Sequence, residues 1–191
     1  MPSFYLLVII VSAVWILSEV GLVILRRSSK TSYATHQKGG SPRSLWLIII
    51  PCITIGVFWS FQTLGFIKSA RFYIIWFGLA LIILGLIIRW IAIYTLRKYF
   101  TVDVAIFKDH KVIKSGLYKS IRHPAYAGSL VSFFGLGWAL GNWVSFIIIF
   151  FPILFAFIRR INIEERALVS SLGEEYREYM RKTKRLIPKI Y

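Results

Sequence analysis

The chain is poor in cysteine, histidine and acidic residues. Its 191 residues include one Cys, three His and eight Asp or Glu. The lone Cys52 rules out an intramolecular disulfide, and three scattered histidines do not have the spacing of a zinc site, so we expect no metal. The sequence also lacks a GxGxxG motif, which argues against a dinucleotide-binding Rossmann domain.

Hydrophobic residues, in contrast, are abundant. They make up 57% of the chain, with 17% aromatic residues, which is more than a soluble domain usually carries. We therefore expect an all-α integral membrane protein. Because about 20 apolar residues suffice to cross a bilayer, we predict one span in each of three runs: residues 4–25, 45–67 and 72–96.

A fourth apolar run, residues 125–158, is too long for one crossing. Gly141 and Asn142 near its middle form a turn signal. We therefore predict a helical hairpin here, spans 4 and 5 of a five-span protein, followed by a cytoplasmic C-terminal helix. A helix is expected over residues 159–180, interrupted at Gly173.

Positive charge is concentrated on one side of these spans. The net charge is +16, and residues 26–43, 97–122 and 159–189 carry five, seven and nine Lys or Arg. The other side has only Lys68 and Arg71. Anionic membrane lipids explain this pattern better than nucleic acid does, so we expect no nucleic-acid partner. The positive-inside rule predicts an outside N-terminus and a cytoplasmic C-terminus, in the inner membrane of a prokaryote or the endoplasmic reticulum of a eukaryote.

Two charges, Glu19 and Arg89, remain within the predicted spans. Intramembrane charges are functional candidates by default. Arg89, however, lies about two turns from the cytoplasmic end of its span, where a long side chain can snorkel to the headgroups. We therefore expect a structural role for Arg89 and leave the role of Glu19 open.

The cytoplasmic segments, residues 97–123 and 159–191, are too short for a separate catalytic domain. Any active site must be assembled from both of them at the membrane face. The first includes residues 100–113, which we expect to be an ordered loop with short extended pieces. The chain thus divides into residues 1–96, with three spans, and residues 97–191, with both segments and the hairpin.

The stretch GLYKSIRHPAY, residues 116–126, is the best clue to chemistry. Pro124 disfavours a helical conformation at His123, but it suits the first position of a helix. An Arg, a His and two Tyr therefore gather where a helix begins. The alternative interpretation is a membrane-entry segment, with Arg122 and His123 at the headgroups and both tyrosines in the aromatic belt.

Arg160 and Glu164 form a second constellation. They are four residues apart, so they share one face of a helix. They lie at the cytoplasmic end of the fifth span, at the same membrane face as the first motif. A cation and an anion at one pocket suit a zwitterionic ligand. An exposed ion pair, worth a few tenths of a kcal/mol, is the alternative.

These two motifs in this order, with the tail LGEEYREYMRKTKRLIPKI, resemble the isoprenylcysteine carboxyl methyltransferase family, whose wider group includes phospholipid methyltransferases. The resemblance covers residues 101–190. It implies an S-adenosylmethionine pocket between the loop and the C-terminal helix, with Arg160 and Glu164 as catalytic residues and Arg160 binding the acceptor carboxylate. Asp103 stands where some members have Gln. The implied cofactor contacts are Asp103, His110, Lys111, Val112, Ile113, Tyr118, His123, Pro124, Ala125, Tyr126 and Glu164.

The resemblance implies methyl transfer to a lipid-linked or isoprenoid acceptor that enters from the bilayer. A carboxylate is already ionised at pH 7, so its methylation needs positioning and desolvation rather than a strong base. Another lipid acid and a lipid amine such as phosphatidylethanolamine remain open as acceptors. A non-catalytic membrane partner and a transporter are alternatives of other classes. The oligomeric state does not follow from the sequence.

Overall fold

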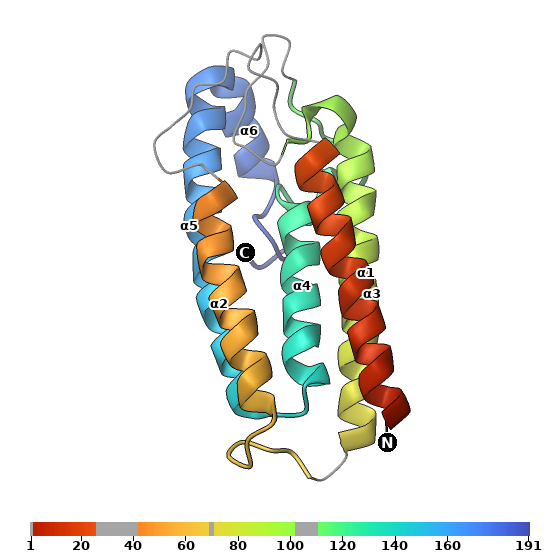
Figure 1. Ribbon diagram of the computed structural model, residues 1–191. Helices are drawn as coiled ribbons and strands as arrows, with labels where there is room; N and C mark the ends of the chain where they lie inside the picture. Colours follow the sequence, from red (N-terminus) through yellow and green to blue (C-terminus); the bar gives the residue numbers. More distant parts are fainter. Residues whose placement is uncertain (1, 26–41, 69–70, 102–110) are drawn as a thin grey trace.

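The computed structural model describes residues 2–25, 42–68, 71–101 and 111–191. Within these ranges the chain forms helices and two isolated bridges but no sheet. Figure 1 shows α1 to α5 running along one common direction, with α6 at one end. The helices are α1 (Pro2–Leu25), α2 (Pro42–Ser60), α3 (Arg71–Leu96), α4 (Pro124–Ala139), α5 (Trp143–Leu172) and α6 (Glu174–Lys182), with short 3₁₀ turns η1 (Arg97–Tyr99) and η2 (Gly116–Lys119).

Among the described residues, α2, α3 and α5 are long and apolar enough to cross a membrane. Their outer faces expose large hydrophobic side chains, such as Leu47 at 76% and Phe155 at 65%. Such surfaces suit lipid rather than water. The expected helical membrane protein is therefore confirmed. The apolar part of α1, Leu6–Leu22, is shorter, and α4 has only 16 residues, so the count of five spans stays a prediction.

The predicted end of the second span is wrong. Helix α2 ends at Ser60 rather than Ile67, because residues 61–67 turn and bind the loop between α4 and α5. The Ile67 N–H donates to the Gly141 carbonyl at 3.0 Å, and the Trp143 N–H donates to the Gly65 carbonyl at 3.0 Å. Gly65 takes a φ of +82°, which favours glycine and lets the chain reverse there.

The predicted hairpin of α4 and α5 is confirmed. Asn142 caps α5 by accepting hydrogen bonds from the N–H groups of Val144 and Ser145. The helix then runs for 30 residues, well past the predicted span end at Ile158. With a rise of about 1.5 Å per residue, α5 is roughly 45 Å long and α4 roughly 24 Å. The last turns of α5 therefore extend beyond the start of α4, where they provide one wall of the site.

Helices α3 and α4 pack backbone against backbone. A Cβ on Gly78 would lie 2.6 Å from the Gly135 carbonyl oxygen, and one on Gly128 would lie 2.6 Å from the Gly85 carbonyl oxygen. Small residues spaced seven apart on both helices make this close approach possible. The packing fixes the first turn of α4, and hence His123 and Tyr126, against α3.

The C-terminal segment folds back onto the loop before α4. The N–H groups of Arg122 and His123 donate to the carbonyls of Lys184 and Arg185 at 2.7 and 3.0 Å. Leu186 is buried in the main hydrophobic core. The helical tail was predicted, and its break at Gly173, where φ is +58°, is confirmed. The pairing beyond α6 was not predicted.

Candidate active site

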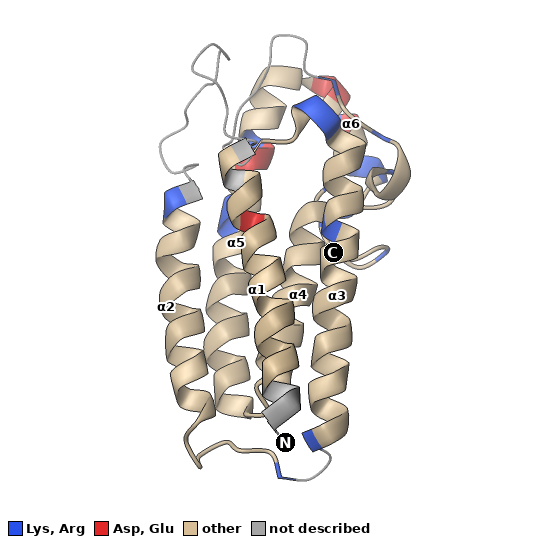
Figure 2. Ribbon diagram, turned by 45° about the vertical axis from the view of Figure 1, so that its right-hand side comes forward, with Lys and Arg blue, Asp and Glu red and all other residues tan. Residues whose placement is uncertain are grey.

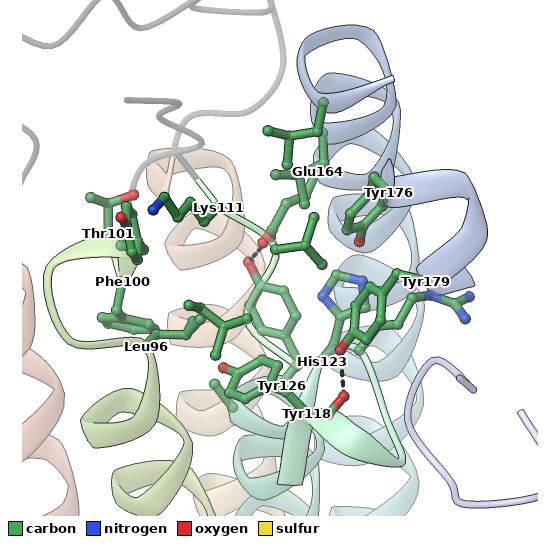
Figure 3. A pocket seen from close by; sticks show the side chains of 17 residues that line it. Leu96, Phe100, Thr101, Lys111, Tyr118, His123, Tyr126, Glu164, Tyr176 and Tyr179 are labelled. Carbon is green, nitrogen blue, oxygen red and sulfur yellow. Dashed lines mark hydrogen bonds between the residues drawn. The ribbon is translucent and has the colours of Figure 1, made fainter. Parts of the chain in front are cut away.

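A cavity opens at the α6 end of the bundle, between α4, α5, α6 and the loop after α3. Figure 3 shows its side chains, several of them tyrosines, pointing toward one another from these elements. We call it the tyrosine cavity. It is lined by Leu96, Tyr99, Phe100, Thr101, Lys111, Val112, Ile113, Tyr118, Arg122, His123, Ala125, Tyr126, Glu164, Leu168, Leu172, Tyr176 and Tyr179.

Most of the residues implied by the resemblance line this cavity: Lys111, Val112, Ile113, Tyr118, His123, Ala125, Tyr126 and Glu164. Pro124 does not; it is fully buried at the first position of α4, as predicted. Asp103 and His110 lie outside the described residues, as does most of the predicted loop. Described residues Phe100, Thr101 and Lys111 have no regular secondary structure.

The sequence reasoning missed several lining residues. Tyr176 and Tyr179 come from α6, and their spacing of three residues was the signal that they share a face. Leu168 and Leu172 follow Glu164 at helical spacings of four and eight on α5. Arg122 stands within the quoted motif but was not assigned to the cofactor.

The Tyr126 hydroxyl connects Arg160 to Glu164. It donates to Oε2 of Glu164 at 2.6 Å and accepts from Nε of Arg160 at 2.9 Å. Arg160 is only 5% exposed. The interpretation of Arg160 and Glu164 as an exposed ion pair is therefore wrong, because Arg160 is buried and a tyrosine lies between the two charges.

A second network fixes the loop that carries His123. Oε1 of Glu165 lies 2.8 Å from Nε of Arg122 and 3.3 Å from Nε2 of His123, and Oε2 accepts from Arg185 at 2.7 Å. The Arg122 guanidinium also donates to the carbonyls of Met180 and Thr183. Glu165 is 3% exposed. This single carboxylate thus joins α5 to the loop before α4 and to the C-terminal segment.

The tyrosines on the α6 side are neutral hydrogen-bonding groups. Burial raises the pKa of Tyr118 and of Tyr176, and the negative charge of Glu164 raises both further. Burial likewise raises the pKa of Tyr179, whose hydroxyl donates to the Tyr118 carbonyl at 2.7 Å. These phenols therefore stay protonated at neutral pH and offer aromatic faces to a ligand.

A second cavity lies between α1, α2, α3, α4 and α5. We call it the inter-helix cavity. It shares Phe100, Thr101 and Tyr126 with the tyrosine cavity, and Arg160 belongs to this second cavity only. The other lining residues are Trp15, Glu19, Leu45, Trp46, Ile49, Arg89, Ser129, Phe133 and Phe157. Arg160 thus lines a cavity with many apolar side chains, whereas Glu164 lines the tyrosine cavity.

Arg89 does not snorkel to the headgroups, contrary to expectation. Its Nε lies 2.5 Å from Oε1 of Glu19, and its Nη2 donates to Oε2 at 2.7 Å. Its Nη1 donates to the Ala125 carbonyl at 3.2 Å. An intramembrane carboxylate is the better partner because it neutralises the guanidinium without moving it to water. The pair also assigns Glu19, whose role the sequence left open, to this cavity.

The charges and rings around the tyrosine cavity suit a cationic or zwitterionic aromatic ligand. Glu164 offers a carboxylate from α5 and Lys111 an ammonium from the loop side (Figure 3). Tyr118, Tyr126 and Tyr176 offer ring faces for stacking and for cation–π contacts. Among the described residues, no group of three His, Cys, Asp or Glu side chains is placed to hold a metal ion.

Family models, curated proteins and solved structures each include a match to the same family. The profile of the isoprenylcysteine carboxyl methyltransferase (ICMT) family matches residues 78–170. A protein-S-isoprenylcysteine O-methyltransferase of Dictyostelium discoideum is 30% identical over 179 residues, covering 86% of this chain and 67% of that protein. Protein-S-isoprenylcysteine O-methyltransferase B of Arabidopsis thaliana is 36% identical over 114 residues, covering 59% and 58% of the two chains.

A solved structure has a similar fold. It is that of the eukaryotic intramembrane Ras methyltransferase ICMT, which matches with a TM-score of 0.63 and 28% identity over 78% of this chain and 53% of that one. The chain thus spans between about half and two thirds of the length of these three proteins. The matched region holds the α3–α4 packing, Tyr126, Arg160 and Glu164.

Proposed function

The chain belongs to the isoprenylcysteine carboxyl methyltransferase family, and we propose that it transfers a methyl group from S-adenosylmethionine to the carboxylate of a lipid-linked isoprenoid acceptor. The observation that carries this proposal is the position of Tyr126. Its hydroxyl joins Glu164, which lines the tyrosine cavity, to Arg160, which lines the inter-helix cavity. A cofactor site and an acceptor site therefore adjoin at one side chain.

The residues of the tyrosine cavity fit S-adenosylmethionine. The cofactor carries a sulfonium, an ammonium, a carboxylate and an adenine ring. Glu164 would bind the ammonium or the ribose hydroxyls, and Lys111 the carboxylate. Tyr118 and Tyr176 would pack on the adenine or the sulfonium, because aromatic faces attract both rings and cations. When bound, the cofactor supplies an electrophilic methyl group on sulfur.

Arg160 would orient the acceptor. Its guanidinium charge would attract and orient a carboxylate, and its Nε donates to the Tyr126 hydroxyl. The carboxylate is already ionised at pH 7, so no side chain has to remove a proton. The chain would position the acceptor and exclude water, since Arg160 is 5% exposed and lies in a cavity with many apolar side chains.

The charge of Arg160 favours an acid over an amine as the acceptor. A guanidinium in a low-dielectric cavity attracts a carboxylate and repels the ammonium form of a phospholipid amine. The apolar remainder of the cavity, including Trp46, Phe133 and Phe157, suits an isoprenoid chain. Helix α1 packs against α3, and α2 packs against α5. Because α1 and α2 both line the cavity, the acceptor would enter from the bilayer between them.

We also propose five spans with the active site on the cytoplasmic side. Figure 2 supports this orientation, since charged residues gather at the α6 end of the bundle. At the opposite end, Lys68 lies in the connection from α2 to α3, and Arg71 is the first residue of α3. Both cavities would then lie near the cytoplasmic face, where a soluble cofactor can reach the first and a lipid can reach the second.

Two variants test the division of roles. Arg160→Ala should raise the acceptor KM and lower turnover by at least about tenfold, while the Kd of S-adenosylmethionine changes little. Glu164→Ala should raise the Kd of S-adenosylmethionine by a similar factor. Calorimetric titration of the cofactor and its demethylated product into detergent-solubilised protein measures the Kd. Labelled methyl transfer to an amine-acetylated isoprenylcysteine, a fatty acid and phosphatidylethanolamine measures acceptor use.

The charge-swapped variant Arg160→Glu with Glu164→Arg provides a further test. A simple ion pair survives such an exchange, whereas two sites of opposite polarity do not. Full methyl transfer by the swapped protein would overturn the assignment. So would equal losses of cofactor and acceptor affinity in both single variants.

A further inference from the structure

The chain after α6 turns back along the bundle. In both Figure 1 and Figure 2 the end marked C lies beside the helices rather than beyond α6. Lys184 forms a parallel bridge with Ile121, just before α4, and Leu186 is buried in the main hydrophobic core. Residues 187–191, which we call the C-terminal turn, therefore start level with the beginning of α4, where a basic segment meets the apolar helices.

The C-terminal turn pairs most of its own backbone donors. The N–H groups of Leu186 and Ile187 both donate to the main-chain oxygen of Tyr191 at 2.7 Å. The N–H groups of Ile190 and Tyr191 donate to the Ile187 carbonyl at 3.2 and 3.1 Å. Pro188 has no N–H to pair. Such a backbone can enter the edge of a bilayer at little cost, because it relies little on water for its hydrogen bonds.

The side chains of the turn combine exposed hydrophobic groups with lysines. Ile187 is 50% exposed, Ile190 75% and Tyr191 42%. Lys184 and Lys189 are exposed as well. Residues 179–191 contain five Lys or Arg and no Asp or Glu. Isoleucines next to lysines suit the boundary between acyl chains and anionic headgroups, because the first can enter the chains while the second reach the phosphates.

We propose that the C-terminal turn is a binding site for anionic phospholipid, in the leaflet at the α6 end of the bundle. Ile187 and Ile190 lie among the acyl chains. Tyr191 lies at the level of the headgroups, where tyrosine is enriched in membrane proteins. Lys184 and Lys189 bind the lipid phosphates. The inference does not depend on the proposed methyl transfer.

Lipid is the occupant that the surroundings of the turn favour. The outer faces of α2, α3 and α5 expose large hydrophobic side chains, so lipid surrounds the bundle without any further partner. The positive charge of residues 179–191 attracts anionic headgroups and repels the same basic segment of a second copy. Charge and position therefore point to the bilayer itself rather than to another protein.

Spin labelling tests the position of the turn. Cys52 is the single cysteine of the chain, so full-length Cys52→Ala protein with Ile190→Cys carries one label. The protein is reconstituted in nanodiscs of phosphatidylcholine, with or without phosphatidylglycerol. Power saturation then compares how well the label is reached by oxygen, which dissolves among acyl chains, and by a water-soluble nickel chelate. In nanodiscs with phosphatidylglycerol, oxygen should reach this label better than the chelate does. Glu178→Cys, at an exposed position of α6, is the matched control and should show the opposite preference.

Substitution of the lysines tests recognition of the headgroups. Lys184→Gln and Lys189→Gln should each lower the ratio of lipid-facing to water-facing label about fivefold in nanodiscs with phosphatidylglycerol. Neither should change the ratio in phosphatidylcholine alone, because a zwitterionic headgroup carries no net charge. Lys68→Gln removes the same charge from an exposed lysine at the opposite end of the bundle, so it should leave the ratio unchanged.

Three results would overturn the proposal. Better access of the chelate to the Ile190→Cys label in anionic nanodiscs would place the turn in water. A label shielded from both reagents would place it against protein, such as a second copy. A ratio that responds neither to phosphatidylglycerol nor to the lysines would show hydrophobic contact without recognition of the headgroup.

A second label position keeps the test independent of one variant. If Ile190→Cys does not fold, Ile187→Cys carries the label, since that side chain is also exposed. The measurements use neither the cofactor nor an acceptor, so a negative result would leave the proposed function untouched.

Discussion

The Tyr126 hydroxyl donates a 2.6 Å hydrogen bond to Oε2 of Glu164. The bond joins the first turn of α4 to the part of α5 that extends beyond it. The Tyr126 ring also stacks on His123, with centroids 5.7 Å apart at an interplanar angle of 26°. The position of the Glu164 carboxylate in the tyrosine cavity therefore depends on a residue of the GLYKSIRHPAY motif.

Tyr126→Phe should weaken cofactor binding without unfolding the protein. The ring and its stacking on His123 remain, but Glu164 loses a hydrogen bond. A bond to a charged group is worth about 1.5–3 kcal/mol, so the Kd of S-adenosylmethionine should rise at least about tenfold in calorimetry. Tyr94→Phe is the control, because Tyr94 is 74% exposed and lies outside both cavities. Equal affinities of the wild type, Tyr126→Phe and Tyr94→Phe for S-adenosylmethionine would refute the role of the Tyr126 hydroxyl.

Glu165→Ala should destabilise the folded protein. The substitution leaves Arg122, His123 and Arg185 without the carboxylate that they share. Removing one partner of a buried ion pair typically costs about 3–5 kcal/mol of unfolding free energy. The comparison is Glu174→Ala, which removes an exposed carboxylate from α6. Unfolding in detergent, followed by circular dichroism, should show a large loss of unfolding free energy for Glu165→Ala only. Equal unfolding midpoints for the two variants would contradict this prediction.

Gly128→Ala should disrupt the contact between α3 and α4. The added Cβ would lie 2.6 Å from the Gly85 carbonyl oxygen and 2.7 Å from the backbone nitrogen of Arg89, so the two backbones must separate. Overpacking of this kind costs about 1–3 kcal/mol. Gly21→Ala is the matched substitution on α1, where a Cβ meets nothing within 4 Å. Gly21→Ala should be neutral or slightly stabilising. Equal thermal stabilities of the two variants would show that the close packing of α3 against α4 is not required.

The sequence was sufficient for elements whose signal is local. Apolar length indicated the long helices, and Gly141 with Asn142 indicated the hairpin turn because both turn geometry and helix capping depend on nearby residues. Pro124 likewise marked the start of α4. Much of the cavity followed from one motif, since Tyr118, His123 and Tyr126 lie within nine residues.

The sequence was insufficient where distant segments meet. The helix expected over residues 159–180 is present, up to its break at Gly173, as the last turns of α5, but the packing of these turns against α6 could not be predicted from the sequence. Hydropathy ended the second span too late, because the bond from Ile67 to Gly141 depends on a partner far along the chain. Arg89 was expected to snorkel because nothing local indicates Glu19, which lies 70 residues away.

Reporter fusions should test the proposed orientation. Reporters placed after Arg27, after Lys119 and at Tyr191 should report the cytoplasm, because these positions adjoin the three basic segments. A reporter between Lys68 and Arg71 should report the outside. A cytoplasmic signal from that fourth position would rule out the five-span topology.

The most direct test of the central claim is the chemical stability of the transferred label. Wild-type protein is incubated with methyl-labelled S-adenosylmethionine and an equimolar mixture of amine-acetylated farnesylcysteine and phosphatidylethanolamine, and the lipid product is then treated with alkali. Methylation of a carboxylate gives an ester, which alkali hydrolyses to volatile labelled methanol, whereas methylation of an amine gives an alkali-stable product. The account predicts that the label is released, and that Arg160→Ala protein gives at least about tenfold less of it. Alkali-stable label, or no transfer by protein that binds the cofactor, would contradict it.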